Sequence, residues 1–326
     1  MTNLLFTSVG RRVELINIFR QKSCGHGTVV AVDNANTAPA LYSADFALTV
    51  PLITNENYID ILLDICRRHD IHGVTTCIDP EITLLSQHAG RFEKDGVCVL
   101  HSPADTVEIC FDKFRMYSFL VDQGYDTPLS FDSLASFESA EKRGDIRFPV
   151  FVKPRTGSGS VGIEKIESHS QLVNYLSTAR CDSIIQEYMQ CEEYDADVYV
   201  DLVTKKLVST FTKKKLSSRL GGADKTVSCK APALFELIED FVHRLGIVGP
   251  ADIDFFKRDG RYFISEVNPR FGGAYLHAHA CGINFPKLVR NNLNGQPNER
   301  EIGNYEEGVY MMMYDSVIFK RSDELC

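Results

Sequence analysis

The sequence predicts an α/β domain with a parallel sheet at the N-terminus, followed by a larger α+β portion. Short apolar runs alternate with helical patterns over roughly the first hundred residues, which is the rhythm of βαβ units. From residue 148 onward strand-like segments dominate. A turn signal, Arg258-Asp259-Gly260, stands between two segments of alternating polarity and predicts a hairpin.

The elements of the N-terminal portion follow from the length of each apolar run. We expect strands where the runs are short, at residues 4–7, 29–32, 46–50, 74–77 and 97–100. Helical patterns lie between them at residues 13–19, 58–66 and 82–85. Strands that alternate with helices in this way pair in parallel, so this portion is expected to form one domain over residues 1–110.

The second portion begins with an amphipathic helix at residues 112–121, and Thr127-Pro128 then breaks the chain. Strands are expected at residues 148–154, 161–166, 183–189, 195–203 and 207–214. A helix at residues 235–245 precedes the predicted hairpin at residues 251–269. We divide this portion into a smaller unit over residues 111–187 and a C-terminal unit over residues 188–326.

Composition limits the classes of function. The 326 residues are 44% hydrophobic, which suits a globular protein, and the net charge of −9 argues against nucleic acid or an anionic membrane as the main partner. No apolar stretch approaches the length of a membrane span. The ten cysteines occur singly, without the spacing of a zinc or redox motif, so we expect reduced thiols. A cytoplasmic protein is the expectation.

The first strand ends in Ser8-Val9-Gly10-Arg11-Arg12, which opens a helix. A dinucleotide-binding turn would look similar, but it needs three glycines for the backbone to approach a pyrophosphate, and only Gly10 is present. A nicotinamide or flavin enzyme is therefore disfavoured. Arg11 and Arg12, at the start of the helix, could instead face a substrate anion, and Asp79-Pro80-Glu81 is similarly placed after a later strand.

A glycine-rich segment follows the strand that ends in Lys153. It contains Thr156, Gly157, Ser158, Gly159, Ser160 and Gly162. The N–H and hydroxyl groups of such a segment can surround phosphate oxygens, and a cation at the end of a buried strand suits a phosphate. A P-loop is excluded because the lysine precedes the glycines. A phosphate-binding flap is the prediction, with an ordinary surface loop as the alternative.

The second strand of the predicted hairpin carries polar residues at alternate positions. Alternation places Glu266, Asn268 and Arg270 on one face, and the preceding strand presents Asp252 and Asp254 in the same way. Carboxylates that converge there repel one another unless a cation lies between them. Oxygen ligands of this kind suit Mg²⁺, and the arginine can pair with a phosphoryl group. The alternative is a solvated acidic face.

Taken in order, these segments resemble the ATP-grasp superfamily. The resemblance is carried by Lys113, Lys153 with its glycine-rich loop, Gln186-Glu187-Tyr188-Met189, Glu193-Tyr194-Asp195 and Glu266-Val267-Asn268-Pro269-Arg270. The chain looks similar to single-module proteins akin to one synthetase half of the carbamoyl-phosphate synthase large subunit. The N-terminal portion resembles the Rossmann-like domain that precedes the grasp in that group.

The resemblance implies that Lys113 and Lys153 contact the phosphates of ATP, under the loop. It implies an adenine and ribose site in which Glu187 accepts from the adenine amino group, Met189 provides backbone at the hinge, and Glu193 binds the ribose hydroxyls. Tyr188 is also implied to bind ATP, and Lys153 to lie near the adenine as well.

The resemblance also implies a metal site. Glu266 and Asn268 would hold Mg²⁺, with Mn²⁺ as an alternative, together with Asp254. Similar proteins often carry glutamine at the position of Asp254, so the number of metal ions stays open. Arg270 would steady the transferred phosphoryl group, and with Lys153 it is the residue expected to act in catalysis.

The implied reaction is activation of a carboxylate by the γ-phosphate, followed by attack of an amine or another nucleophile on the acyl phosphate. Such a reaction needs positioning and charge neutralisation rather than a protein nucleophile. Two alternatives remain, a carbamoyl-phosphate-synthase-type subunit and a non-catalytic ATP-binding regulatory protein. Against the first, the sequence holds one such module and has no room for a glutaminase domain.

Small-molecule carboxylate and amine substrates are the expected partners, and a homodimer is one option for the assembly. Candidate substrate residues are Arg11, Lys214 within a basic run at residues 213–215, Arg219 before a glycine pair, and the Gly272-Gly273 turn. A solvated face is the alternative for the basic run. His277 and His279 are expected to be structural rather than metal ligands.

Overall fold

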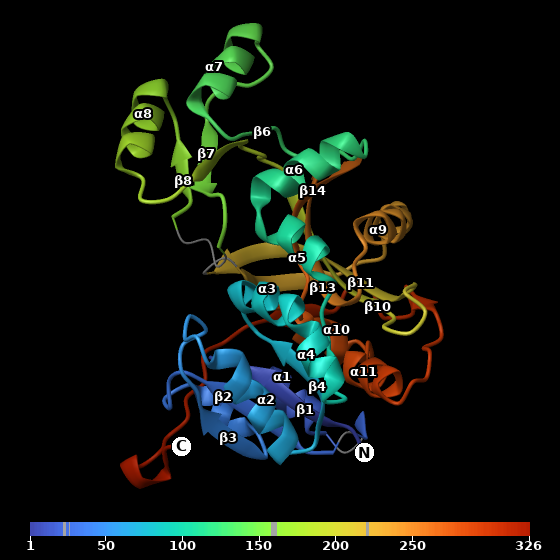
Figure 1. Cartoon of the computed structure of the whole chain (residues 1–326). Helices are drawn as coiled ribbons and strands as arrows, with labels where there is room; N and C mark the ends of the chain where they lie inside the picture. Colours follow the sequence, from blue (N-terminus) through green and yellow to red (C-terminus); the bar gives the residue numbers. More distant parts are fainter. Residues whose placement is uncertain (22–23, 26, 158–161, 220–221) are drawn as a thin grey trace.

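The computed structural model describes residues 1–21, 24–25, 27–157, 162–219 and 222–326. Over these residues, the strands form a parallel sheet near the N-terminus and two sheets in which antiparallel pairing predominates (Figure 1). The fold class expected from the sequence is therefore confirmed. Figure 1 shows the parallel sheet at one end of the molecule and the smaller antiparallel sheet at the other, with the larger sheet between them.

The N-terminal sheet has the strand order β3-β2-β1-β4-β5. Its strands are β1 (Asn3–Thr7), β2 (Val29–Asp33), β3 (Phe46–Thr49), β4 (Ile71–Thr76) and β5 (Cys98–Val99). Leu4 and Phe6 of β1 belong to one hydrophobic cluster and Leu5 to another. Both faces of this strand are thus buried, which explains why it reads as a continuous apolar run rather than an alternating one.

Helices cover the two faces of this sheet. They are α1 (Val13–Phe19), α2 (Tyr58–Arg68), α3 (Asp79–Gln87), α4 (Ala89–Lys94) and the 3₁₀ helix η2 (Pro39–Ser43). The expected helix at residues 82–85 is thus longer than predicted. Two further helices, α5 (Ala104–Phe111) and α6 (Lys113–Asp122), lead to the next sheet, and Asp112 caps α6 by accepting from the Phe114 and Arg115 backbone N–H groups.

The smaller antiparallel sheet has the order β6-β9-β7-β8. Its strands are β6 (Ser130–Phe131), β7 (Val150–Pro154), β8 (Glu164–Ile166) and β9 (Ser183–Glu187), and it is covered by α7 (Leu134–Arg143) and α8 (His169–Thr178). This unit has a core of its own, which contains Phe137, Val150, Val152, Leu172 and Ile185. β7 and β8, which correspond to strands expected at residues 148–154 and 161–166, pair on either side of the glycine-rich segment.

The larger sheet has the order β14-β13-β10-β11-β12-β16, and β15 pairs with β11. Its strands are β10 (Glu192–Val200), β11 (Leu207–Arg219), β12 (Gly222–Ser228), β13 (Gly249–Arg258), β14 (Arg261–Asn268), β15 (Glu301–Ile302) and β16 (Tyr310–Met312). Ala196, Ile253 and Val267 on one face pack in a cluster with α9 (Pro232–Leu245). The opposite face is the polar face described below.

The predicted hairpin is present as β13 and β14. Arg258 pairs with Arg261, and the two residues between them, Asp259 and Gly260, have φ angles of 51° and 79°. Two consecutive positive φ values define the tight turn that suits twisted antiparallel strands, and Asp-Gly is a favoured sequence for it.

Two short helices, α10 (Tyr275–Ala280) and α11 (Phe285–Leu293), return to the N-terminal sheet. Phe271, Tyr275 and Phe285 share a cluster with Leu4 and Phe6 of β1, so this core joins the two ends of the sequence.

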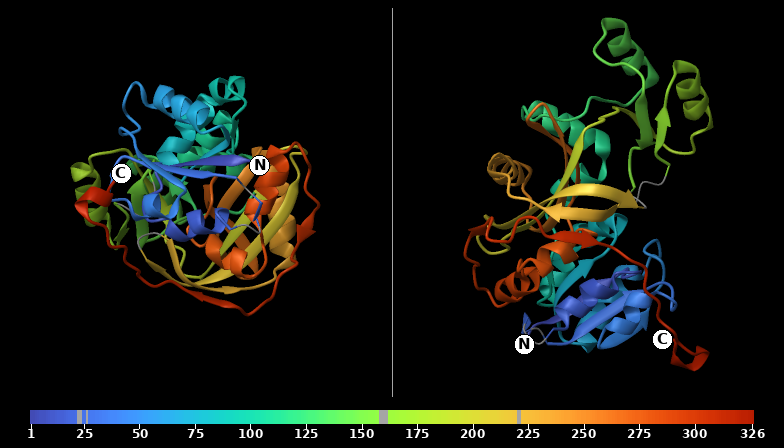
Figure 2. Two further views of the ribbon diagram at one scale, coloured as in Figure 1. Left: turned by 90° about the horizontal axis from the view of Figure 1, so that it is seen from below. Right: turned by 180° about the vertical axis from the view of Figure 1, so that it is seen from behind.

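The C-terminal segment, which includes the 3₁₀ helix η3 (Ser322–Glu324), also runs to the N-terminal domain (Figure 2). The Thr49 hydroxyl donates to the Cys326 carbonyl at 3.0 Å.

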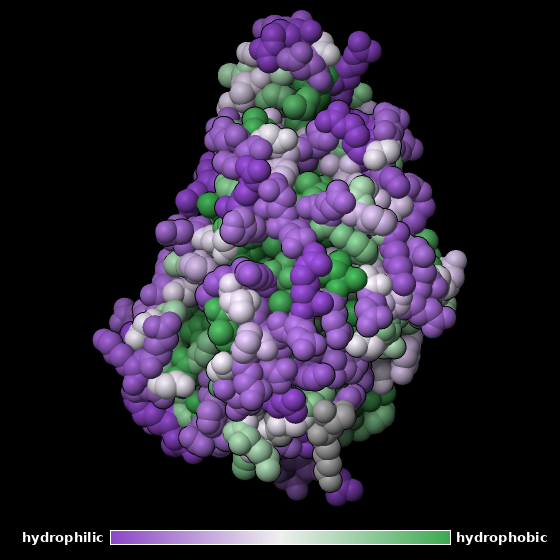
Figure 3. All heavy atoms as spheres, turned by 90° about the vertical axis from the view of Figure 1, so that its right-hand side faces the viewer, coloured by the Kyte–Doolittle hydropathy of each residue, from purple (hydrophilic) through white to green (hydrophobic). Residues whose placement is uncertain are grey.

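Within the described parts of the chain, no helix has the length and apolar character needed to cross a membrane. The face drawn in Figure 3 is mainly hydrophilic, with apolar residues in scattered areas.

Candidate active site

Four adjacent strands of the larger sheet bring one row of charged side chains together. In the register, Glu266 of β14 is opposite Asp254 of β13, Asp254 is opposite Asp195 of β10, and Asp195 is opposite Lys213 of β11. Paired residues on neighbouring strands point to the same face of a sheet. Lys213 is fully buried, and its Nζ lies 2.8 Å from Asp195 Oδ1 and 2.5 Å from Asp197 Oδ2.

A second row lies one step along the same face. Asn268 is opposite Asp252, and Asp252 is opposite Asp197. Both Asp252 and Asp197 are buried, and the Oδ1 atom of each has no hydrogen-bond partner among the described residues. A Cβ atom at Gly272 would lie 2.6 Å from Asp197 Oδ1 and 2.8 Å from Asp252 Oδ1. A larger residue at this position of the predicted Gly272-Gly273 turn would therefore force the two carboxylates to move.

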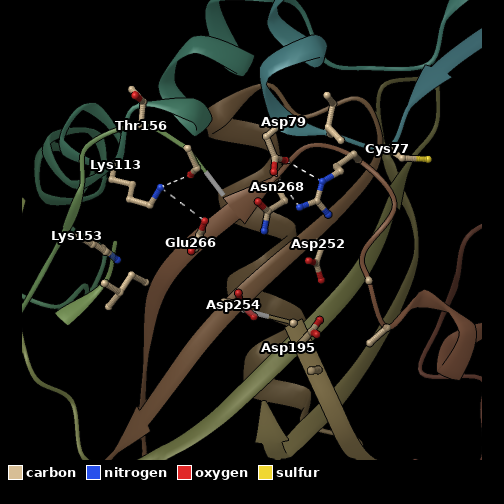
Figure 4. A pocket seen from close by; sticks show the side chains of 18 of the residues that line it. Cys77, Asp79, Lys113, Lys153, Thr156, Asp195, Asp252, Asp254, Glu266 and Asn268 are labelled. Carbon is tan, nitrogen blue, oxygen red and sulfur yellow. Dashed lines mark hydrogen bonds and ion pairs between the residues drawn. The ribbon is translucent and has the colours of Figure 1, made fainter. Parts of the chain in front are cut away.

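Two lysines face this polar sheet from the other side of a pocket (Figure 4). Lys153 is the penultimate residue of β7 and is only 7% exposed, while Lys113 begins α6. Lys113 Nζ donates to the Gly157 carbonyl at 2.6 Å and lies 4.0 Å from Glu266 Oε1. The pocket is lined by Arg12, Cys77, Ile78, Asp79, Lys113, Lys153, Pro154, Thr156, Gly157, Ile163, Asp195, Lys215, Gly222, Ala223, Asp252, Asp254, Glu266, Asn268, Arg270, Gly273 and Ala274.

The two lysines are connected through the start of the glycine-rich loop. Arg155 Nε donates to both oxygens of Asp112, at 2.8 and 2.9 Å, and the Lys113 backbone N–H donates to the Arg155 carbonyl at 3.0 Å. Asp112 thus caps α6 and also holds Arg155. This arrangement fixes the distance between the end of β7 and the first residue of α6.

Arg270 lies between the larger sheet and the N-terminal domain. Its Nε and Nη2 atoms donate to the two oxygens of Asp79, at 2.8 and 3.1 Å, and its Nη1 donates to the Phe271 carbonyl at 3.2 Å. Asp79 is the first residue of α3, so the N-terminal domain supplies the partner of this arginine. The bidentate pair holds the guanidinium in one orientation at the edge of the pocket.

Burial changes the protonation of several pocket groups. Burial lowers the pKa of Lys153 to about 8, and the nearby charge of Lys113 acts in the same direction. Burial raises the pKa of Asp254 to about 6; Asp195 and Glu266 add to this effect, and Lys215, which forms an ion pair with Asp254, opposes it. The lysine side of the pocket is therefore suited to an anion and the carboxylate side to a cation.

The donor set on the carboxylate side fits magnesium. Asp254, Glu266 and Asn268 offer two carboxylates and an amide oxygen, and the unpartnered oxygen of Asp252 lies next to them in the register. Magnesium binds one or two carboxylates and completes its shell with water and phosphate oxygens. Among the described residues, no group of three or more Asp, Glu, His or Cys side chains is arranged to hold a metal ion by itself.

The residues expected around adenine and ribose lie where the smaller sheet joins the larger one. Glu187 ends β9, and its carboxylate accepts from the Leu129 backbone N–H at 3.3 Å and from Arg258 Nη1 at 2.5 Å. Tyr188 and the buried Met189 follow, and Glu193 lies on β10. None of these four lines the pocket described above, and their contacts with a nucleotide stay predictions.

The structure brings two of the candidate substrate residues, Arg11 and Arg219, to one carboxylate outside the pocket lining and places Lys214 elsewhere. Arg11 pairs with Asp315 at 3.0 Å, and the same carboxylate lies 2.9 Å from Arg219. Lys214 pairs with Glu192, because alternation along β11 turns it away from the face that carries Lys213 and Lys215. Among the described residues, Gly273 lines the pocket, whereas Arg11, Lys214 and Arg219 do not.

The expected loop is described in part. Thr156 and Gly157 line the pocket, and the Gly162 carbonyl accepts from the Tyr175 hydroxyl at 2.7 Å. Ser158, Gly159 and Ser160 lie outside the described residues.

His277 is buried, hydrogen-bonds with Thr226 at 2.8 Å, and has its pKa lowered to about 4 by burial, as expected for a structural residue.

Four charged pocket residues were not among the principal predictions. Asp79 and Arg12 were noted in the sequence only as possibilities, and neither Lys215 nor Asp195 was singled out as a pocket residue. A usable signal existed for Asp195, since acidic residues alternate with apolar ones along residues 194–198. The role of Lys215 depended on the register between β10 and β11, which the sequence does not reveal.

Two family descriptions match successive parts of the chain. "PylC-like, N-terminal domain" matches residues 4–100, and "ATP-grasp domain" matches residues 110–274. The second match covers the smaller sheet, the polar rows of the larger sheet and Arg270.

Curated relatives share this likeness at low identity. The chain is 23% identical over 278 residues to the carbamoyl phosphate synthase large chain of Gemmatimonas aurantiaca, covering 80% of this chain and 25% of that one. It is 26% identical over 252 residues to the protein of the same name from Thermotoga neapolitana, covering 72% and 22%. The chain thus spans about a quarter of the length of these relatives.

Solved structures show the same fold. An L-amino acid ligase from Bacillus licheniformis aligns with a TM-score of 0.70 and 21% identity, covering 92% of this chain and 75% of that one. A biotin carboxylase complex from Campylobacter jejuni aligns with a TM-score of 0.75 and 15% identity, covering 94% and 74%. A 2-oxoglutarate carboxylase domain from Hydrogenobacter thermophilus, solved with MgADP and bicarbonate, aligns with a TM-score of 0.74 and 16% identity, covering 94% and 73%.

Proposed function

The chain belongs to the ATP-grasp family, and from this premise we propose that it is an ATP-dependent ligase that joins a carboxylic acid to an amine or another nucleophile. In the first step a carboxylate oxygen attacks the γ-phosphorus, the bond to ADP breaks, and an acyl phosphate forms. In the second step the nucleophile attacks the acyl carbon and phosphate leaves, with one proton released when the nucleophile is an amine.

The observation that carries the proposal is the opposition of charges across one pocket. Lys113 and Lys153 lie on one side, and Glu266, Asp254 and Asn268 lie on the other. The lysines are placed to hold the phosphates of ATP, and the oxygen ligands to hold magnesium. When bound, the ion would neutralise charge on the phosphates.

The remaining residues are assigned by position. Arg270, held by Asp79, supplies a fixed guanidinium two residues after Asn268, and both residues line the pocket, so Arg270 can stabilise the phosphoryl group during transfer. The glycine-rich loop from Thr156 to Gly162 is assigned to the phosphates, and two of its described residues, Thr156 and Gly157, line the pocket. Glu187, Tyr188, Met189 and Glu193 bind the adenine and ribose at the junction of the two sheets.

Release of phosphate from MgATP tests the proposal. Purified protein is incubated with MgATP and pairs of carboxylic acids and amines, including amino acids and sugar acids, and phosphate is measured. We expect phosphate release that requires both an acid and a nucleophile and that falls by roughly 100-fold or more in Glu266→Ala and Lys153→Ala, because each removes several kcal/mol of charge stabilisation. Turnover that is unchanged in both variants would contradict the assignment of the site.

The curated relatives favour a second candidate function, a carbamoyl-phosphate-synthase-type subunit. Bicarbonate is then the carboxylate, and ammonia is the nucleophile. Turnover with bicarbonate and ammonia, without any organic acid, would favour this function over the first. If ATP binds but no combination supports turnover, a non-catalytic ATP-binding protein is favoured instead.

A further inference from the structure

Arg12 is a pocket cation without a carboxylate partner. Arg270 pairs with Asp79, Lys215 pairs with Asp254, and Lys113 faces Glu266. In the described part of the chain, no carboxylate lies within ion-pair distance of Arg12, although Asp252 and Asp197 act on its charge from further away. Lys153 also has no ion-pair partner among the residues that the structure describes, but it lies on the side of the pocket assigned to the phosphates of ATP.

The Arg12 guanidinium is nevertheless held in a fixed position. Its Nη2 donates to the Phe271 carbonyl at 2.9 Å and to the Gly272 carbonyl at 2.7 Å. The Arg12 backbone N–H donates to the Val9 carbonyl at 2.9 Å, at the turn that precedes α1. Two backbone contacts on one nitrogen leave the other guanidinium N–H groups for another acceptor.

The surroundings of Arg12 leave space for such an acceptor. Gly273 lines the pocket, and a Cβ atom at this position would lie 3.7 Å from Arg12 Nη1. The glycine therefore keeps the approach to this nitrogen open. Cys77, which lines the same pocket, does not supply the missing charge, because burial raises the pKa of its thiol to about 11 and keeps it neutral.

Arg12 also lies beside the arginine assigned to the phosphoryl group. The Phe271 carbonyl accepts from Arg12 Nη2 at 2.9 Å and from Arg270 Nη1 at 3.2 Å, so one oxygen atom joins the two guanidinium groups. Arg270 is neutralised by Asp79, whereas Arg12 is not. The uncompensated positive charge next to the reacting groups is therefore that of Arg12.

We propose that Arg12 binds a carboxylate group of the acid substrate and places it beside Arg270. This inference rests on the proposed ligase function and adds the residue that recognises the acid. The anchored guanidinium donates charge-assisted hydrogen bonds to the carboxylate, and Gly273 provides the space that the carboxylate occupies. Arg12 differs in this role from the adjacent Arg11, because Arg11 pairs with Asp315 outside the pocket lining.

Direct binding of carboxylates tests the inference. The twenty proteinogenic amino acids, acetate, succinate and bicarbonate are titrated by calorimetry into the full chain bound to magnesium and a non-hydrolysable ATP analogue. We expect the tightest-binding member to lose about 10- to 100-fold in affinity in Arg12→Gln, which is the range for hydrogen bonds to charged groups. Affinity for the ATP analogue should not change.

Arg11→Gln is the matched control, because it removes the same charge from the adjacent position. Its exposed ion pair with Asp315 lies outside the pocket, so carboxylate affinity should change by less than about twofold. Equal carboxylate affinity in wild type and Arg12→Gln, no binding of any panel member to wild type, or an equal loss in the two variants would overturn the inference.

A second variant covers the case in which Arg12→Gln disturbs the fold. Gly273→Ala leaves Arg12 and both backbone acceptors in place, since the added Cβ makes ordinary van der Waals contact at 3.7 Å. Carboxylate affinity should fall several-fold with an unchanged melting temperature.

Carboxylate binding that depends on Arg12 without any phosphate release would contradict the ligase proposal and leave this inference standing. Acid-dependent phosphate release with an unchanged KM for the acid in Arg12→Gln would contradict this inference and leave the ligase proposal standing.

Discussion

Lys153 carries its charge at the end of a strand where water has little access. Its side chain is buried, and the pKa of its ammonium group is lowered to about 8 by desolvation. The group is charged below that pH and becomes neutral as the pH rises through it. An ammonium group that is destabilised in the empty pocket gains most from an incoming phosphate, since the anion replaces the lost hydration.

The pH dependence of kcat/KM for ATP should therefore decline as the pH rises through about 8, because this parameter reports the free enzyme. Lys153→Arg provides the comparison, since arginine stays charged at these pH values. The decline should disappear in Lys153→Arg even if the overall rate is lower. A wild-type profile that stays flat up to pH 9.5, roughly a unit and a half above that pKa, would contradict a role for the Lys153 charge.

Single residues were predicted well where alternation along one strand was sufficient. Glu266 and Asn268 could be placed on one face from their spacing alone. The choice between Arg11 and Arg12, and between Lys214 and Lys215, could not be made. It depends on which face of a helix or strand meets the pocket, and a shift of one residue in register exchanges the two faces.

At the scale of elements, α6 and β7 are held together by Asp112 and Arg155. Arg155 donates to both Asp112 oxygens, and the Lys113 N–H donates to the Arg155 carbonyl. The two lysines that face the phosphates belong to these two elements. Their separation is therefore set by one ion pair and one backbone hydrogen bond.

Breaking that ion pair should weaken ATP binding more than it slows the reaction. Asp112→Asn retains an oxygen that can cap α6 but loses the charge, and Arg155→Gln removes the other partner. We expect the KM for ATP to rise by about 3- to 10-fold in each, with a smaller change in kcat, because a partly exposed pair contributes on the order of 1 kcal/mol. Steady-state kinetics with MgATP give both parameters.

The control for this pair is Arg143→Gln. Arg143 forms an exposed ion pair with Asp145 in the same part of the chain, at 2.8 Å, and among the described residues none of its hydrogen bonds or ion pairs involves the loop. Its KM for ATP should match that of the wild type. A KM that is unchanged in Asp112→Asn and Arg155→Gln as well would show that the ion pair does not position the lysines.

Elements with strong apolar periodicity were predicted from the sequence, and more polar ones were not. The helix α1 and the hairpin of β13 and β14 were found where expected. The helices α7 and α8 were not predicted, although Ser133 and Ser168 are N-cap residues that could have indicated their starts. The strand β12 is rich in polar residues and has its place in the sheet only through pairing with β11 and β16.

At the scale of the whole molecule, one hydrophobic cluster joins the N-terminal sheet to the segment after β14. Phe271 is 2% exposed, and its ring packs against Phe19 of α1 and against Tyr275 and Phe285, with centroid distances of 5.4, 5.6 and 6.4 Å. The backbone of Phe271 also accepts from Arg12 and Arg270. The core that stabilises the molecule therefore also positions the pocket.

Phe271→Ala should lower the free energy of unfolding by about 3–5 kcal/mol, the usual cost of removing a buried phenylalanine side chain. Because the cluster is shared, the N-terminal domain and the larger sheet should unfold together, with coincident urea transitions by circular dichroism and by tyrosine fluorescence. Phe319→Ala is the control, since this side chain is 87% exposed and its loss should change stability by less than about 0.5 kcal/mol. Two separate transitions in the wild type would contradict a shared core.

The order of the domains and the family resemblance could be predicted from local patterns, but the contact between domains could not. Asp79 of the N-terminal domain meets Arg270 across 191 positions of the sequence. No periodicity encodes a contact of that kind, because it depends on how two finished units pack.

The central claim is that the γ-phosphate of ATP is transferred to a carboxylate in this pocket. Transfer of ¹⁸O tests it most directly: an acid that supports phosphate release is labelled in its carboxylate, turned over with MgATP and the nucleophile, and the phosphate is analysed by mass spectrometry. An acyl phosphate passes one carboxylate oxygen to the phosphate when the nucleophile displaces it. We therefore predict one ¹⁸O atom in each phosphate formed, and unlabelled phosphate from turnover of the labelled acid would contradict the account.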